Sequence, residues 1–345
     1  MIGALASLVG VTGVLLALPM APAFLELYVR RDTGPVPVKN RTEKVADFAQ
    51  DFRELLQDRS GAAQQIPVYG TAMVLDKDSF LDEGVFFADP IYAKGRLTGG
   101  GNNVFSAIFC EKDVDLGKNA KVLSWVHAQG VVIVPPASTV YGRLSAGEQV
   151  ELGSRCSFER VHAPIVTVVG GAEAERYESE TGECCSKIHL VLRHGSEAAP
   201  AEAEAPVWNP APHSILERVT DRLLAEEDFV LQAATDFRKN VVASRRVHLG
   251  EGSHAIGNLK SKSDMVLEQN VHVEGCLVSE ADLRIGPGCL VMGPVLSDGD
   301  LIIESGTQIG TLDHPTTVRA PRIHIAPGVT LHGSLWAREF GRVTG

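Results

Sequence analysis

The pattern of hydrophobic and polar residues in the C-terminal third of the chain repeats every eighteen residues. With Val247 as position 1 of a unit, apolar residues return at positions 1, 3, 9 and 13 of each unit, with glycine at 11, serine at 15 and aspartate at 18. A fixed period of this size is typical of a solenoid, in which each unit covers only its neighbours. The equivalent residues are Val247, Met265, Leu283 and Leu301; Leu249, Leu267, Ile285 and Ile303; Ala255, Val273, Val291 and Ile309; Gly257, Gly275 and Gly293; Leu259, Leu277 and Val295; Ser261, Ser279 and Ser297; Asp264, Asp282 and Asp300.

Within one unit the apolar residues alternate with polar ones at positions 1 and 3, 7 and 9, and 13 and 15. Alternation with a period of two residues is the pattern of a β-strand with one buried face. Three short strands per unit, separated by corners, make one coil of a β-helix. The sequence therefore predicts an all-β, single-stranded β-helix with eighteen residues per coil, in which Ile285 and Val291 point inward while Arg284 and Leu290 point outward.

The same register extends over two blocks. It runs back to Phe229 and forward, through one enlarged unit, to Ile323, and an earlier block repeats it at Val114, Val132 and Val150. Weaker coils at Asp78 and Arg96, with Phe105, Ile108, Phe86 and Ile91 as their apolar residues, extend the earlier block. We predict about five coils over residues 66–166, an insertion over 167–228, and six coils over 229–340.

The insertion has a different composition from the coils. Residues 166–169 and 188–192 are predicted as two strands outside the coil pattern, and the segment 196–212, rich in Ala, Glu and Pro, is predicted to be a disordered linker. Ser214 followed by Glu217 has the spacing of a capping box ahead of apolar residues at helical spacing. This pattern predicts a short helix over 214–226 that caps the second block.

The first 29 residues predict a transmembrane anchor, because residues 2–25 carry no charge and are long enough to cross a hydrocarbon core. Basic residues follow this segment and none precede it, so the positive-inside rule places the body of the protein in the cytoplasm, at the bacterial inner membrane with a single pass. The alternative is a cleaved signal peptide with Ala21-Pro22-Ala23 as its cleavage motif. The basic residues that set the topology are Arg30, Arg31, Lys39, Arg41 and Lys44.

Residues 30–65 are predicted as a linker followed by an amphipathic helix over 42–57. Thr42 can cap this helix, and Val45, Phe48 and Phe52 share one face of it with Leu55 and Leu56. The apolar face either covers the open end of the first coil or lies at the membrane interface.

The composition is consistent with a β-helix and limits the classes of function that fit the chain. The chain has 34 glycines and 6% aromatic residues, which suits a narrow interior. Its net charge of −11 excludes a nucleic-acid-binding role by electrostatics, and its six cysteines show no disulfide framework, which fits a reducing compartment.

The sequence predicts no catalytic, cofactor-binding or metal site, and hence no enzyme. His248, His254, His272 and His324 fall at outward positions, where histidines are usually solvated. His314, in the enlarged coil, is the one residue that could act as a general base, although no partner for it is visible in the sequence.

The repeat resembles that of the bactofilins, a family of polymer-forming bacterial cytoskeletal proteins. The resemblance rests on units such as residues 283–300, LRIGPGCLVMGPVLSDGD, and covers residues 229–338 well and 96–165 moderately. It implies a right-handed β-helix, polymerisation without nucleotide by head-to-head and tail-to-tail contacts, and a scaffold role at the membrane. Two alternatives stay open: a left-handed acyltransferase of the hexapeptide-repeat family, with His314 as its base, and an exported envelope β-solenoid.

The C-terminal coil is the predicted self-assembly interface. A β-helix ends in open strand edges and an exposed apolar core, and only residues 338–345 follow the last coil of this chain. We therefore predict that this end pairs with another copy of the chain in a two-fold contact. The candidate interface residues are Ile323, Ile325, Val329, Leu331, Leu335, Trp336 and Phe340.

Overall fold

The computed structural model describes residues 64–66, 70–170, 215–219 and 222–345. These residues form strands, turns and irregular segments, and they contain no helix. The predicted all-β fold is confirmed for this part of the chain. The described residues belong to one compact unit that spans residues 48–345.

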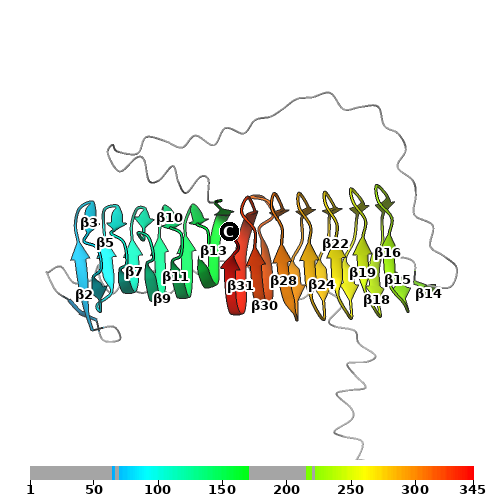
Figure 1. Cartoon of the computed structure of the whole chain (residues 1–345), viewed down its shortest axis with the longest axis horizontal. Coiled ribbons are helices and arrows are strands. Elements are labelled where there is room, and N and C mark those ends of the chain that lie inside the picture. Colours follow the sequence, from blue (N-terminus) through cyan, green and yellow to red (C-terminus); the bar gives the residue numbers. More distant parts are fainter. Residues whose placement is uncertain (1–63, 67–69, 171–214, 220–221) are drawn as a thin grey trace, which may run out of the picture. The chain divides into compact units, whose positions relative to one another are not determined.

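The first block contains the strands that follow in chain order (Figure 1). They are β1 (Gln64–Ile66), β2 (Gly70–Leu75), β3 (Ser79–Leu81), β4 (Phe86–Phe87), β5 (Ile91–Ala93), β6 (Leu97–Gly99), β7 (Val104–Cys110), β8 (Val114–Asp115), β9 (Lys121–Ala128), β10 (Val131–Val134), β11 (Thr139–Ala146), β12 (Gln149–Leu152) and β13 (Ser157–Val168).

The second block contains the remaining strands. They are β14 (Ile215–Val219), β15 (Arg222–Ala225), β16 (Phe229–Leu231), β17 (Asp236–Phe237), β18 (Asn240–Ala243), β19 (Val247–Leu249), β20 (His254–Ala255), β21 (Leu259–Ser261), β22 (Met265–Leu267), β23 (His272–Val273), β24 (Leu277–Ser279), β25 (Leu283–Ile285), β26 (Leu290–Val291), β27 (Val295–Ser297), β28 (Asp300–Ile303), β29 (Gln308–Ile309), β30 (Thr316–Ile325) and β31 (Thr330–Val343).

Each strand of a coil pairs in parallel with the equivalent strand of the next coil, so the two blocks together form a solenoid of about 12 turns. The eighteen-residue register is confirmed where Met265 pairs with Leu283 and Leu283 with Leu301. Ile285 and Val291 are fully buried. The residues that precede them, Arg284 and Leu290, point outward, as the alternation predicts.

The apolar interior forms one continuous core from Leu81 in the first block to Val343 in the second. The repeated small and polar residues hold the corners of each coil. The Ser279 hydroxyl donates to the carbonyl oxygens of Ser263 and Asp282, and the Asp282 carboxylate accepts from the backbone N–H of Asp300 at 2.8 Å. These bonds satisfy backbone groups that the sharp corner leaves without a ladder partner.

The repeated glycine at position 11 is required by close packing between coils. A Cβ atom at Gly275 would lie 2.1 Å from the carbonyl oxygen of Gly257, and one at Gly293 would lie 2.5 Å from the carbonyl oxygen of Gly275. Of the three, only Gly257 has a positive φ, of 141°. The stacking distance between coils, more than backbone conformation, therefore explains this column of glycines.

The predicted helix over 214–226 is wrong. Residues 215–219 and 222–225 instead form an antiparallel hairpin, β14 with β15. Leu223 and Ala225 lie eighteen residues before Val241 and Ala243, and β15 pairs in parallel with β18 at those positions. Pairing with the neighbouring coil therefore decides the structure of this segment over its local helical pattern.

The register also slips where coils differ from eighteen residues. Leu97 pairs with Val114, seventeen residues on, so the inward residues begin at Leu97 rather than Arg96. In the first coil Phe86 is exposed and Phe87 packs on the core, one residue from the expected position. Val166 was expected outside the coils, but β13 continues the solenoid through it and pairs with Val150 of β12.

Several predictions fall on residues outside the described ranges. They are the transmembrane anchor, its flanking basic residues, the helix over 42–57, and the strand and linker over 188–212. Within the described ranges, we find no helix with the length and apolar character needed to span a membrane.

Candidate functional site

The two blocks meet at their C-terminal ends. Strand β13, the last of the first block, pairs antiparallel with β31, the last of the second, and the register runs from Ser157 opposite Arg342 to Thr167 opposite Thr330 (Figure 1). Backbone bonds extend the contact: the N–H of Val168 donates to the carbonyl of Val329, and the N–H of Val343 donates to that of Cys156. Among the described strands, all other pairings between consecutive coils are parallel, so the chain direction of the solenoid reverses at this junction.

Two histidines bond across the junction, one on each side of the pair Ala163 and Gly333. His162 Nδ1 and Ser334 Oγ share a hydrogen bond of 2.8 Å on one side of this pair. On the other side, His332 Nδ1 donates to the carbonyl oxygen of Pro164 at 3.1 Å. A histidine from each block thus bonds to the other block.

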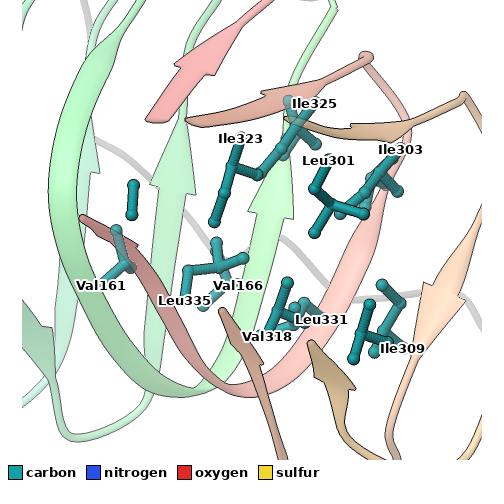
Figure 2. Packing of buried hydrophobic residues seen from close by; sticks show 14 of the residues in the cluster. Val161, Val166, Leu301, Ile303, Ile309, Val318, Ile323, Ile325, Leu331 and Leu335 are labelled. Atoms are coloured by element: carbon teal, nitrogen blue, oxygen red, sulfur yellow. The ribbon is translucent and has the colours of Figure 1, made fainter. Parts of the chain in front are cut away.

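Apolar side chains of both blocks fill the interior at the junction. Figure 2 shows Val161 and Val166 of the first block beside Leu335 and Leu331 of the second, with Ile323 above them. Val161 lies opposite Leu335, and Val166 opposite Leu331, in the antiparallel register. Each of these side chains is at most 2% exposed, so the core of one block continues into the other without a solvent layer.

The predicted assembly residues therefore lie at this junction, but their partner is the first block of the same chain. We expected a second copy to cover the apolar end of the last coil; β13 covers it instead. The end of the last coil is covered, as expected, but only the tertiary structure shows that the covering strand belongs to the same chain. Five of the seven residues are buried there: Ile323, Ile325, Val329, Leu331 and Leu335.

Trp336 and Phe340 point outward and remain partly exposed. The guanidinium groups of Arg160 and Arg319 each lie 4.9 Å from the Trp336 ring centroid, one from each block. Two cation–π contacts of this kind contribute about 0.5–1 kcal/mol each at an exposed surface. Phe340 packs edge-on against His324 within the second block. Trp336 therefore stabilises the junction at its outer surface by contacting both blocks, and Phe340 stabilises the last coil.

The reversal leaves the first coil of each block at an outer end of the solenoid. A hairpin, β1 with β2 or β14 with β15, covers one strand of each of these coils. In the described part of the chain, the other two strands of the first coil of the first block, β3 and β4, pair only with the following coil. Phe80 and Phe86 lie on β3 and β4 and are 72% and 62% exposed. The first coil of the first block therefore combines open strand edges with exposed aromatic side chains.

A second apolar cluster lies on the outer face of the first block. Tyr92, Phe109 and Trp125 each precede an inward residue, so they point away from the core, yet all are at most 7% exposed. The Tyr92 hydroxyl donates to the Glu111 carboxylate, and Phe109 stacks on His127 at 5.4 Å. The sequence analysis missed this cluster. Its signal was an aromatic side chain at the same outward position of neighbouring coils.

Burial changes the protonation of the histidines beside this cluster. Burial, followed by the proximity of His162, lowers the pKa of His127 to about 4. The pKa of His162 is also lowered by burial. Both imidazoles are therefore neutral at pH 7. His127 bonds through Nδ1 to the Ser145 hydroxyl, as His162 does to Ser334.

His314 lies in the exposed turn between β29 and β30. Its backbone N–H and carbonyl bond to those of Thr311, which closes the turn. The structure thus places His314 of the enlarged coil on a surface loop.

Comparison with known proteins adds no assignment, since no protein-family model, curated protein or solved structure matches this chain.

Proposed function

We propose that the chain is a membrane-anchored structural scaffold, a rigid solenoid that assembles with other copies through the first coil of its first block. The observation that carries this proposal is the junction of β13 with β31, which joins the C-terminal coils inside one chain. Because that contact is already made, we assign assembly to the outer end of the first block, where β3 and β4 pair only with the following coil in the described part of the chain. The bactofilin resemblance supports the scaffold role, since this junction has the form of a tail-to-tail contact.

The continuous core supports a mechanical role. A solenoid of about 12 turns spaced by 4.7–4.9 Å is roughly 55–60 Å long. Every coil is hydrogen-bonded to its neighbours and packed on one apolar column, so bending requires breaking ladder bonds on one side. Such a body is suited to hold a fixed spacing between its two ends.

The outer end of the first block favours self-assembly. Unpaired strand edges are templates for pairing with another chain, and natural β-proteins usually protect them. Here the exposed Phe80 and Phe86 lie along the open edges of the first coil. Edge pairing that also covers these rings buries apolar surface, at about 25 cal/mol per Å². Anchoring by residues 2–29, with the solenoid on the cytoplasmic side of the inner membrane, completes the proposal.

Electron microscopy of the full chain in detergent tests the assembly. We expect solenoids joined end to end in the parent protein, and single rods in Phe80→Glu. The matched control is Leu123→Glu, since Leu123 is also an exposed apolar residue, 47% exposed, but lies on an inner coil. Single rods in the parent, or equal loss in both variants, would rule out assembly through the first coil. Discrete trimers would favour the acyltransferase alternative.

A cross-link tests whether the junction forms within one chain. Thr167 and Thr330 lie directly opposite each other, and opposed residues of antiparallel strands have Cα separations of about 4.5–5.5 Å, within the range of a disulfide. Thr167→Cys with Thr330→Cys, in a chain with Cys184 and Cys185 replaced by serine, should oxidise to a monomeric cross-linked product. A disulfide-linked dimer at high dilution would show that the junction joins two copies.

A further inference from the structure

Two histidines and a glutamate converge on the outer face of the second block. His254 on β20 and His272 on β23 are directly paired in neighbouring coils, and their rings stack with centroids 4.5 Å apart. Glu274 follows His272 by two residues and so projects from the same face. His254 Nε2 lies 3.1 Å from Glu274 Oε1. One ligand atom from each of the three residues lies within 4.8 Å of the others.

His272 has an unsatisfied nitrogen at this place. Its Nε2 atom is buried and has no hydrogen-bond partner among the described residues. A buried polar atom without a partner costs about 1–3 kcal/mol, so native structures seldom leave one without a reason. An unpaired imidazole nitrogen at this place can bind a metal ion.

A second carboxylate completes the arrangement. Asp236, one coil earlier, is paired with His254, and its Oδ1 atom lies 3.6 Å from His254 Nδ1. His254 therefore has Glu274 at Nε2 and Asp236 at Nδ1. A histidine that binds a metal through one ring nitrogen commonly directs the other ring N–H to a carboxylate, which fixes the ring and raises its basicity.

We propose that His254, His272 and Glu274 bind a divalent first-row transition metal, with zinc the best match, and that Asp236 orients His254. Two imidazoles and one carboxylate are a ligand set that zinc accepts, with a fourth position left for water or another group. Zinc bonds of about 2.0–2.2 Å place ligand atoms roughly 3.3–3.6 Å apart. The three ligand atoms lie within 4.8 Å of one another, so the side chains must close by at most about an ångström around a bound ion.

The chain contains a matched control for this site. His248 Nε2 lies 3.1 Å from Glu268 Oε1, the same distance and the same spacing of twenty residues as in His254 and Glu274. The residues paired with His248 in the neighbouring coils are Val230 and Val266. This pair therefore has one histidine and one carboxylate but lacks the second imidazole.

Titration of the full chain with Zn²⁺ against a chromophoric chelator tests the proposal, with Co²⁺ absorption as a second readout. We expect His272→Ala and Glu274→Gln to weaken binding by more than about 100-fold, and Asp236→Asn by the roughly 10–100-fold typical of a residue that orients a ligand. His248→Ala should change the affinity by less than about twofold. Zinc should also raise the melting temperature of the parent and of His248→Ala, and leave that of His272→Ala unchanged.

Glu274→Gln keeps the size of the side chain, so its loss of binding cannot be attributed to unfolding if circular dichroism matches the parent. The proposal fails if His272→Ala and Glu274→Gln bind zinc as the parent does, or if His248→Ala weakens binding as much as they do. It also fails if the parent shows no stoichiometric binding. Thiolate-to-cobalt absorption in the parent that persists in His272→Ala would assign the bound metal to cysteines instead.

Discussion

Gly341→Ala should loosen the junction between the two blocks. Gly341 lies opposite Phe158 in the antiparallel pairing of β31 with β13, and the aromatic ring covers the glycine. A Cβ atom at position 341 would lie 2.2 Å from Cε2 of Phe158 and 2.4 Å from its Cζ. Carbon atoms in contact normally lie about 3.5–4.0 Å apart, so the ring must retreat by more than about 1 Å.

The ring has little room to retreat, because Phe158 is 2% exposed and belongs to the continuous core. Overpacking of this kind typically costs about 1–3 kcal/mol. Since the clash lies between two strands of different blocks, the cost falls on the junction. Hydrogen exchange should therefore rise on both β13 and β31 and stay unchanged in β22 and β25, the inner coils of the second block.

A double variant separates the clash from a general loss of stability. Phe158→Leu removes Cε2 and Cζ, the two atoms that the new Cβ would meet most closely, so Gly341→Ala should cost less in the Phe158→Leu background than in the parent. The measurement is the free energy of unfolding of the four proteins, together with hydrogen exchange. Additive effects within about 0.5 kcal/mol, or exchange that rises on β31 alone, would refute the proposed packing of the two blocks.

Three further predictions follow from the register, the buried histidine and the basic flank of residues 2–25. Ile285→Asp should unfold the second block, because it buries an unpaired charge, while Arg284→Asp should cost well under ~1 kcal/mol; equal sensitivity in thermal denaturation would contradict the observed inward and outward directions. The folded-state pKa of His127 is about 4, below its ordinary value of 6.5. The contribution of the neutral imidazole to the stability of the folded state is therefore complete above pH 6.5 and is lost as the pH falls towards 4. Between pH 6.5 and pH 4 the melting temperature should fall less steeply in His127→Phe than in the parent, and the difference in the free energy of unfolding is at most about 3 kcal/mol. Parallel slopes in the two proteins would show that another group titrates. A reporter active only outside the cytoplasm, fused after Gly345, should be silent, and its activity would reverse the proposed topology.

The sequence by itself determined the solenoid. The eighteen-residue period indicates which residues form each coil. The alternation at Leu283, Arg284 and Ile285 predicts which side chains point into the core and which point to the surface. This succeeds because every coil meets the same neighbours, so one local pattern is repeated rather than averaged over different surroundings. The predicted direction of Phe86 is wrong because the coils there depart from eighteen residues. Alternation has a period of two, so a slip of one residue moves a side chain to the other face.

Only the tertiary structure decided which surfaces meet. The hairpin at 215–225 has a helical pattern that pairing with β18 overrides, and no local signal shows that β31 selects β13. Partners more than 150 residues apart are chosen by matching strand edges and apolar volumes, and these exist only once both blocks have folded. The meeting of His254, His272 and Glu274 has a different origin. Their spacing in the eighteen-residue register already aligned them, but the buried nitrogen that makes the alignment informative is a property of the packed surface.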